Sequence, residues 1–122
     1  MKARIGSINI GVRDLDQAVA FYRDVLGFGL VFSEPSSNYA RFDVEGIRLG
    51  VISHDAGSPE ADAFTGRHTG ISIAVDDVDR AYEELKARGA SFPMAPTRQP
   101  WGAYMAMVSD PDGNLYYLET FD

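Results

Sequence analysis

The sequence contains no cysteine and only two histidines among its 122 residues. Without cysteine the chain has no disulfide, no thiolate ligand for a metal ion and no cysteine nucleophile. No apolar run approaches the roughly 18 residues that a membrane-spanning helix requires, so no membrane partner is expected. Residues 1–4 lead directly into a strand pattern without the apolar core of a signal peptide. We therefore predict a cytoplasmic protein.

Clusters of basic residues are also absent. The 11 lysines and arginines are outnumbered by 18 acidic residues, and the formal net charge is −7. Binding to phosphate backbones requires clustered cations, so nucleic acid is not expected as a partner. Hydrophobic residues make up 45 % and charged residues 24 %, which is ordinary for a protein that fills a core. The length predicts one domain, residues 1–122.

The sequence is internally repeated at an offset of 63 residues, because the segment 71–82 resembles the segment 8–19. Apolar, aspartate and alanine positions recur in both copies: Ile8 and Ile71, Ile10 and Ile73, Val12 and Val75, Asp14 and Asp77, Asp16 and Asp79, Ala18 and Ala81. Each copy alternates between apolar and polar residues and then changes to helical spacing, so each predicts a strand followed by a helix. Each unit alone is too small to bury a core, and we expect the two to share one structure, with the site where they meet.

The first module, residues 4–53, is predicted to be strand, helix and three strands: 5–12, 14–26, 28–33, 39–44 and 47–53. Asp14 is placed to cap the helix, and Gly27 to end it in the left-handed conformation. Glu45-Gly46 predicts a tight hairpin turn. The order is βαβββ.

A polar connection, residues 54–68, leads to the second module, residues 69–122. This module is predicted to repeat the order βαβββ: 69–75, 77–88, 91–94, 102–109 and 114–120. Asp77 is the expected helix cap and Gly89 the helix end. Pro93 and Pro96 favour an edge position for the strand that contains them.

Three motifs then carry a family resemblance: Val12-Arg13-Asp14-Leu15 through Phe21-Tyr22 to Leu26-Gly27-Phe28, Val75-Asp76-Asp77-Val78 through Arg88-Gly89-Ala90, and Pro100-Trp101-Gly102 followed by Asp110-Pro111-Asp112-Gly113-Asn114. Their order and spacing resemble the vicinal oxygen chelate superfamily, which includes glyoxalase I, extradiol dioxygenases and bleomycin-resistance proteins. The resemblance implies an α+β fold, in which two βαβββ modules form a curled, cup-shaped mixed sheet around a cavity. It also implies a homodimer.

In metal-using members of this family, four side chains converge in the cup and bind a divalent cation. The resemblance places these positions at Ser7, Gly70 and Tyr117, and at Leu49 or Gly50. None of these residues is a usual ligand for iron, manganese, nickel or zinc. We therefore predict no metal site and no cofactor, which is the bleomycin-resistance-like form of the family.

Three other residues are candidates for a displaced metal site. His68 and Glu119 are each two residues from a family ligand position, and His54 lies in the connection. A strand advances about 3.3 Å per residue, so His68 and Glu119 would lie roughly 6–7 Å from the usual metal level. We interpret the two histidines as solvated side chains.

Strand alternation predicts which side chains line the cavity. Ser7, Asn9, Ser72 and Tyr117 share the inward parity, and Gly11 and Gly70 leave room between them. The resemblance adds Trp101, with Tyr104 close behind it. Aromatic faces among hydroxyl and amide groups suit a planar or amphipathic organic molecule.

The sequence therefore predicts a protein that binds a small organic ligand, with no residue assigned to catalysis. Two enzymatic alternatives stay open. One is a lyase, isomerase or dioxygenase with a displaced metal site at His68 and Glu119. The other is a metal-independent enzyme in which Tyr117 donates a proton or hydrogen bond, although its ordinary pKa near 10 is unsuited to a base at neutral pH.

Overall fold

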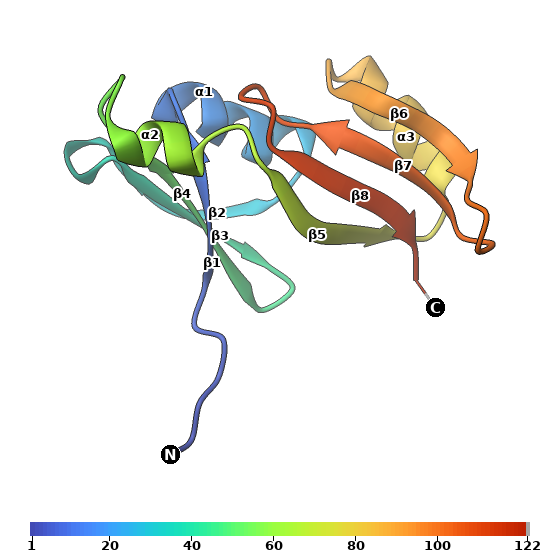
Figure 1. The fold of residues 1–122 in the computed structure, drawn as a ribbon, viewed down its shortest axis with the longest axis horizontal. Coiled ribbons are helices and arrows are strands. Elements are labelled where there is room, and N and C mark those ends of the chain that lie inside the picture. Colours follow the sequence, from blue (N-terminus) through green and yellow to red (C-terminus); the bar gives the residue numbers. More distant parts are fainter. Residues whose placement is uncertain (122) are drawn as a thin grey trace. The chain divides into compact units, whose positions relative to one another are not determined.

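The computed structural model describes residues 1–121 of the chain, which divide into two compact units, Met1–Thr65 and the described residues from Gly66 onward. Each unit contains one four-stranded mixed sheet and a helix packed on one face of it (Figure 1). The predicted α+β class is confirmed, and so is the predicted order βαβββ, which occurs once in each unit. The closing of both sheets around one cup stays a prediction.

The sheet of the first unit, sheet A, has the strand order β1-β4-β3-β2. β1 is parallel to β4, and the other neighbours are antiparallel. The elements of this unit are β1 (Ile8–Val12), α1 (Leu15–Ala20), the π-helix η1 (Phe21–Val25), β2 (Gly29–Glu34), the 3₁₀ turn η2 (Pro35–Ser37), β3 (Tyr39–Val44), β4 (Ile47–Ser53) and α2 (Pro59–Phe64).

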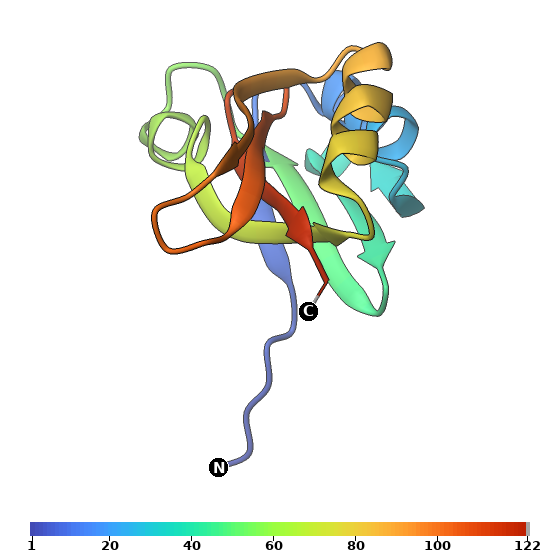
Figure 2. The same ribbon diagram turned by 90° about the vertical axis from the view of Figure 1, so that its right-hand side faces the viewer.

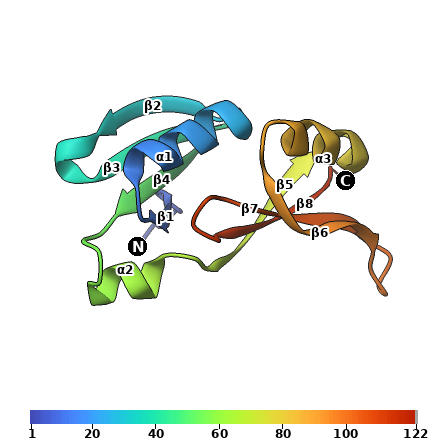
Figure 3. The same ribbon diagram turned by 90° about the horizontal axis from the view of Figure 1, so that it is seen from above.

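The first helix packs on β3 and β4 and begins as predicted (Figure 3). The Asp14 carboxylate accepts a hydrogen bond from the backbone N–H of Gln17 at 2.9 Å. Its last turn is wider than the predicted α-helix, because the Leu26 N–H donates to the Phe21 carbonyl five residues back, at 3.1 Å. Gly27 then ends the helix at a φ of 76°. Tyr22 is fully buried beneath this turn, in the centre of the unit's core.

The connection between the predicted modules contains a helix that the sequence did not predict. The Ser58 hydroxyl caps α2 by accepting from the Ala61 N–H at 3.1 Å. α2 lies against β1, where a Cβ added to Gly11 would be within 2.8 Å of the Phe64 backbone and Cβ. Gly11 therefore accommodates Phe64 rather than leaving room for a ligand. As for the other helices in residues 1–121, the length and polarity of α2 do not suit a membrane span.

The second unit contains sheet B, with the strand order β5-β8-β7-β6. Helix α3 covers β6, β7 and β8 (Figure 2, yellow). The elements are β5 (His68–Val75), α3 (Val78–Ala87), β6 (Ser91–Arg98), β7 (Tyr104–Ser109) and β8 (Leu115–Thr120). The predicted edge position of the proline-containing strand is confirmed, although β6 extends beyond the predicted residue 94. Shifts in its pairing with β7 accompany the prolines.

The turn between β7 and β8 is buried and closely hydrogen-bonded. Asp110 is 3 % exposed and Asn114 is 1 % exposed. One carboxylate oxygen of Asp110 accepts from the Asp112 and Asn114 backbone N–H groups, and the other accepts from the Asn114 side chain at 2.8 Å. The side-chain amide oxygen of Asn114 accepts from the Arg67 backbone N–H at 2.9 Å. The turn thus fixes the segment that leads into β5.

Candidate ligand-binding site

Sheet A has one face packed against its helix and one face free of it. Buried side chains such as Ile10, Val12 and Phe42 occupy the helix face. Along the chain, Ser7 and Asn9 alternate with the apolar residues of β1, so they lie on the opposite face of the sheet. There the Asn9 side-chain amide donates a hydrogen bond to the Ser7 hydroxyl at 3.3 Å. We call this the open face of sheet A. The structure thus brings together the two predicted residues of the first unit.

A group of side chains that the sequence analysis missed lies beside Asn9 on this open face. The Arg41 guanidinium carbon is 5.2 Å from the centre of the Phe32 ring and 5.9 Å from that of Tyr39. Gly50 is the neighbour of both Arg41 and Asn9 on the intervening strand. We call Asn9, Phe32, Tyr39, Arg41 and Gly50 the Arg41 cluster. The alternation of Tyr39 and Arg41 with the core residues Ala40 and Phe42 was the available sequence signal.

A β-bulge places Phe32 in this cluster. Leu30 opposes Phe42, but Phe32 rather than Val31 opposes Arg41, so Val31 is an extra residue in β2. In a regular ladder Phe32 would oppose Ala40 and face the core. One inserted residue reverses the face of every side chain that follows, because the side-chain period is two. Phe32 is therefore carried to the open face.

Sheet B also has a face free of its helix, and Ser72 and Tyr117 lie there as neighbours on β5 and β8. The His68 ring packs against the Tyr117 ring, with 4.9 Å between their centres. The Nδ1 atom of His68 accepts from the Gly70 backbone N–H at 3.2 Å. We call this the open face of sheet B. It presents one hydroxyl, one phenol and one imidazole in a small area.

These residues do not form a metal site within either unit. No group of three or more His, Asp or Glu side chains in residues 1–121 is placed to hold an ion. His68 opposes Leu115, and Glu119 is four residues further along β8, or about 13 Å at the usual rise per residue. Two ligand atoms that bind one ion at roughly 2.3 Å lie at most about 4.6 Å apart, so the two side chains would have to bridge most of this backbone separation. Metal independence stays a prediction, tested below.

The structure does not place Tyr104 with the other predicted site residues. Its hydroxyl donates to the Asp79 carboxylate on α3 at 2.5 Å, so Tyr104 lies on the helix face of sheet B. The expectation that it lies beside the cavity residues is wrong in this respect. Trp101 is 72 % exposed in the turn between β6 and β7, which excludes a role as a core residue.

The hydrogen bond from Tyr104 to Asp79 gives a prediction for the pH titration of the protein. This bond favours the protonated phenol, and it raises the pKa of Tyr104 above its ordinary value. We expect the Asp79→Asn substitution to lower the pKa of this tyrosine, and Tyr104→Phe to remove its step from the titration. Absorbance at about 295 nm, which reports tyrosinate, measures both. Identical titrations of the wild type and Asp79→Asn would contradict the prediction.

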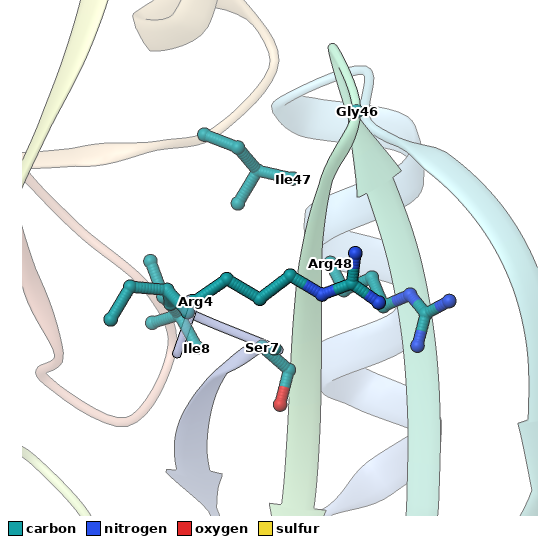
Figure 4. Close-up of a pocket in the computed structure, with 8 residues that line it drawn as sticks. Arg4, Ser7, Ile8, Gly46, Ile47 and Arg48 are labelled. Carbon is teal, nitrogen blue, oxygen red and sulfur yellow. The ribbon is translucent and has the colours of Figure 1, made fainter. Parts of the chain in front are cut away.

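A pocket of about 520 Å³ lies at the start of β1, between residues 4–8 and the β3–β4 hairpin (Figure 4). Of the predicted site residues, only Ser7 lines it. Figure 4 shows Ser7 near the Arg4 and Arg48 side chains, which extend in the same direction. Both arginines are exposed. The Arg41 cluster does not line this pocket.

Comparisons with known proteins identify the family. Residues 4–117 match the model of the Glyoxalase/Bleomycin resistance protein/Dioxygenase superfamily. The chain is 32 % identical to a bleomycin resistance protein of Klebsiella pneumoniae over 117 residues, covering 90 % of this chain and 86 % of that protein. It is 29 % identical to a probable lactoylglutathione lyase of Vibrio cholerae, over 94 % of this chain and 88 % of that one.

The fold comparison agrees with the sequence match. A crystal structure of a superfamily member from Sphaerobacter thermophilus aligns with a TM-score of 0.79 and 33 % identity, covering 98 % of both chains. The protein is therefore a member of the glyoxalase/bleomycin resistance protein/dioxygenase superfamily, as the three sequence motifs indicated.

Proposed function

We propose that the protein binds a small organic molecule on the open faces of its sheets, without a resident metal ion. The observation that carries this proposal is the composition of those faces. Asn9, Tyr39 and Arg41 on sheet A, and Ser72 and Tyr117 on sheet B, replace the apolar side chains that a buried face would carry. A few oriented polar groups among aromatic rings are typical of ligand sites.

The identities at the family's ligand positions support the metal-free form of the proposal. Ser7, Gly70 and Tyr117 offer a hydroxyl, no side chain and a phenol. Neutral hydroxyl and phenol groups are not the donors that divalent transition metals usually select, which are imidazole, thiolate and carboxylate. The similarity to a bleomycin resistance protein supports a binding role rather than turnover.

One observation favours an enzyme as the second candidate. The His68 and Tyr117 rings touch on the open face of sheet B, which places an imidazole beside the phenol that the sequence analysis considered as a proton donor. The similarity to a probable lactoylglutathione lyase supports this alternative. Turnover without added metal, lost on Tyr117→Phe, would favour it over simple binding.

We also propose a homodimer as the assembled form. β1 and β2 are the edges of sheet A, and β5 and β6 are the edges of sheet B. Edge strands present unpaired backbone groups, and a symmetric contact between two copies is a common way to cover them. Sedimentation velocity at micromolar concentration distinguishes a dimer from a monomer.

The binding proposal is tested with a matched pair of tyrosine variants. Tyr117 lies on the open face of sheet B and Tyr104 on the helix face, so Tyr117→Phe and Tyr104→Phe remove one hydroxyl each from opposite faces. Isothermal titration calorimetry uses a panel of bleomycin and neutral, cationic and anionic aromatic compounds. For a compound that binds, we expect Tyr117→Phe to weaken affinity about threefold to tenfold, the effect of one hydrogen bond, and Tyr104→Phe to leave it unchanged.

Two results would contradict the proposal. The first is that no compound binds and Trp101 fluorescence is not quenched by any of them. The second comes from elemental analysis of protein purified without chelator. Stoichiometric manganese, iron, nickel or zinc would show that metal ligands had been overlooked.

A further inference from the structure

Among residues 1–121, no acidic side chain forms an ion pair with Arg41. Its Nε atom donates a hydrogen bond to the Tyr39 hydroxyl at 3.4 Å. Within residues 1–121 its two terminal nitrogens have no hydrogen-bond partner, and no carboxylate forms an ion pair with it. The side chain is nevertheless half-buried on the open face of sheet A. A partly desolvated cation without a counterion is costly, and it gains from an added anion.

The aromatic neighbours hold the guanidinium and leave the N–H donors of its two terminal nitrogens available. Phe32 and Tyr39 lie 5.8 Å apart, and the Arg41 guanidinium lies within cation–π distance of both. Cation–π contacts use the face of the guanidinium, whereas its N–H donors lie in its plane. The two terminal nitrogens form a planar fork of donors of the kind that binds carboxylate or phosphate oxygens in pairs.

Polar groups converge next to Arg41 because Gly50 has no side chain. A Cβ at Gly50 would collide with the Asn9 side-chain oxygen and would lie 3.0 Å from the Tyr39 hydroxyl. Asn9 on β1 and Tyr39 on β3 thus meet above Gly50 on β4, the strand that lies beside Arg41. An amide and a phenol hydroxyl are therefore available next to the guanidinium.

The acidic residues on this face do not compete for Arg41. Asp43 accepts a hydrogen bond from the Gly46 N–H in the hairpin turn, and Glu34 opposes Tyr39 on the exposed edge strand β2. Neither forms an ion pair with Arg41. In a chain with a net charge of −7, the cluster is a local site of uncompensated positive charge.

We propose that the Arg41 cluster binds the anionic group of the ligand, a carboxylate or a phosphate, while a planar part of the same ligand packs on Phe32 and Tyr39. This inference rests on the proposed binding function and assigns the ligand class as planar aromatic anions. Arg41 supplies the charge, Asn9 and Tyr39 supply additional hydrogen bonds, and Gly50 supplies the space in which these groups meet.

The test compares probes of equal shape and different charge. Calorimetric titrations use 2-naphthoate and its neutral analogue 2-naphthamide, and 2-naphthyl phosphate distinguishes a phosphate site from a carboxylate site. We expect at least one anion to bind the wild type about tenfold or more tightly than the amide, from a charge-assisted pair of hydrogen bonds. Arg41→Met is expected to abolish this preference for the anion, and Arg41→Lys is expected to keep only part of it.

The matched control is Arg98→Met. Arg98 also lies over a tyrosine ring, 5.1 Å from the centre of Tyr104, but on the second unit and away from the open faces. It is expected to leave the anion preference unchanged. An NMR measurement uses the wild type alone and so does not depend on the stability of any variant. The Arg41 Nε–H resonance is expected to shift on addition of an anion that binds, and not on addition of 2-naphthamide.

The outcomes separate this inference from the proposed function. Equal affinity for the anions and the amide, or a preference that survives Arg41→Met, overturns the anion site and leaves the binding function standing. If only neutral or cationic compounds of the panel bind, the anion site is likewise overturned and the binding function is kept. Failure of the whole panel overturns both.

Discussion

Replacement of Asn114 by alanine is expected to lower the free energy of unfolding by about 2–4 kcal/mol, because it removes two hydrogen bonds of a side chain that is only 1 % exposed. The Asn114 side chain donates to the Asp110 carboxylate at 2.8 Å and accepts from the Arg67 N–H at 2.9 Å. Alanine makes neither bond. It also leaves the Asp110 carboxylate, only 3 % exposed, with one donor fewer.

Urea unfolding followed by circular dichroism measures this loss. An unchanged slope of the unfolding free energy against urea concentration would show that the folded and unfolded states keep their compactness. Asn9→Ala is the matched control, since Asn9 is exposed and its hydrogen bond to Ser7 is 3.3 Å long. It should remain within about 0.5 kcal/mol of the wild type. A similar effect of both substitutions would show that burial of the Asp110–Asn114 pair contributes little.

Asp110→Asn tests the same turn without changing its volume. The substitution turns one carboxylate oxygen into an amide nitrogen, which cannot accept the hydrogen bonds that both Asp110 oxygens now receive. Because the two residues act as a unit, the double variant should lose less than the sum of the single losses.

Local sequence signals predicted the features whose causes are local. Asp14 and Asp77 cap their helices as the repeat indicated, through hydrogen bonds to residues three positions later. Glu45 and Gly46 form the predicted turn with positive φ at both positions. Strand alternation placed Ser7 with Asn9, and Ser72 with Tyr117, because a period of two holds along an unbroken strand.

The features that were missed depend on contacts between distant segments. The bulge at Val31 brings Phe32 to Arg41, yet nothing in residues 29–34 shows where the ladder with β3 gains a residue. Tyr104 follows the turn that contains Trp101, and only its bond to Asp79 on α3 shows which face it occupies. Of the Arg41 cluster, the predicted site therefore contained only Asn9.

Helix α2 illustrates the same limit, because its six residues carry little periodicity and its place is fixed by Gly11 on β1. Gly11→Ala is expected to destabilise the protein by about 1–3 kcal/mol, the usual effect of overpacking. The new Cβ would lie 2.5 Å from the Phe64 carbonyl oxygen and 2.7 Å from its carbonyl carbon. These are backbone atoms, so the strain is relieved only by movement of α2 away from β1.

Urea unfolding measures the loss, and hydrogen exchange of residues 59–64 reports the movement of α2 separately from global stability. Gly6→Ala is the matched control on the same segment. A Cβ at Gly6 meets no atom within 4 Å, and its backbone is outside the positive-φ region that strains alanine. That variant should remain within about 0.5 kcal/mol of the wild type. Wild-type stability and unchanged exchange in Gly11→Ala would show that α2 is not held against β1 in solution, and the open face of sheet A would then extend over the surface that α2 covers.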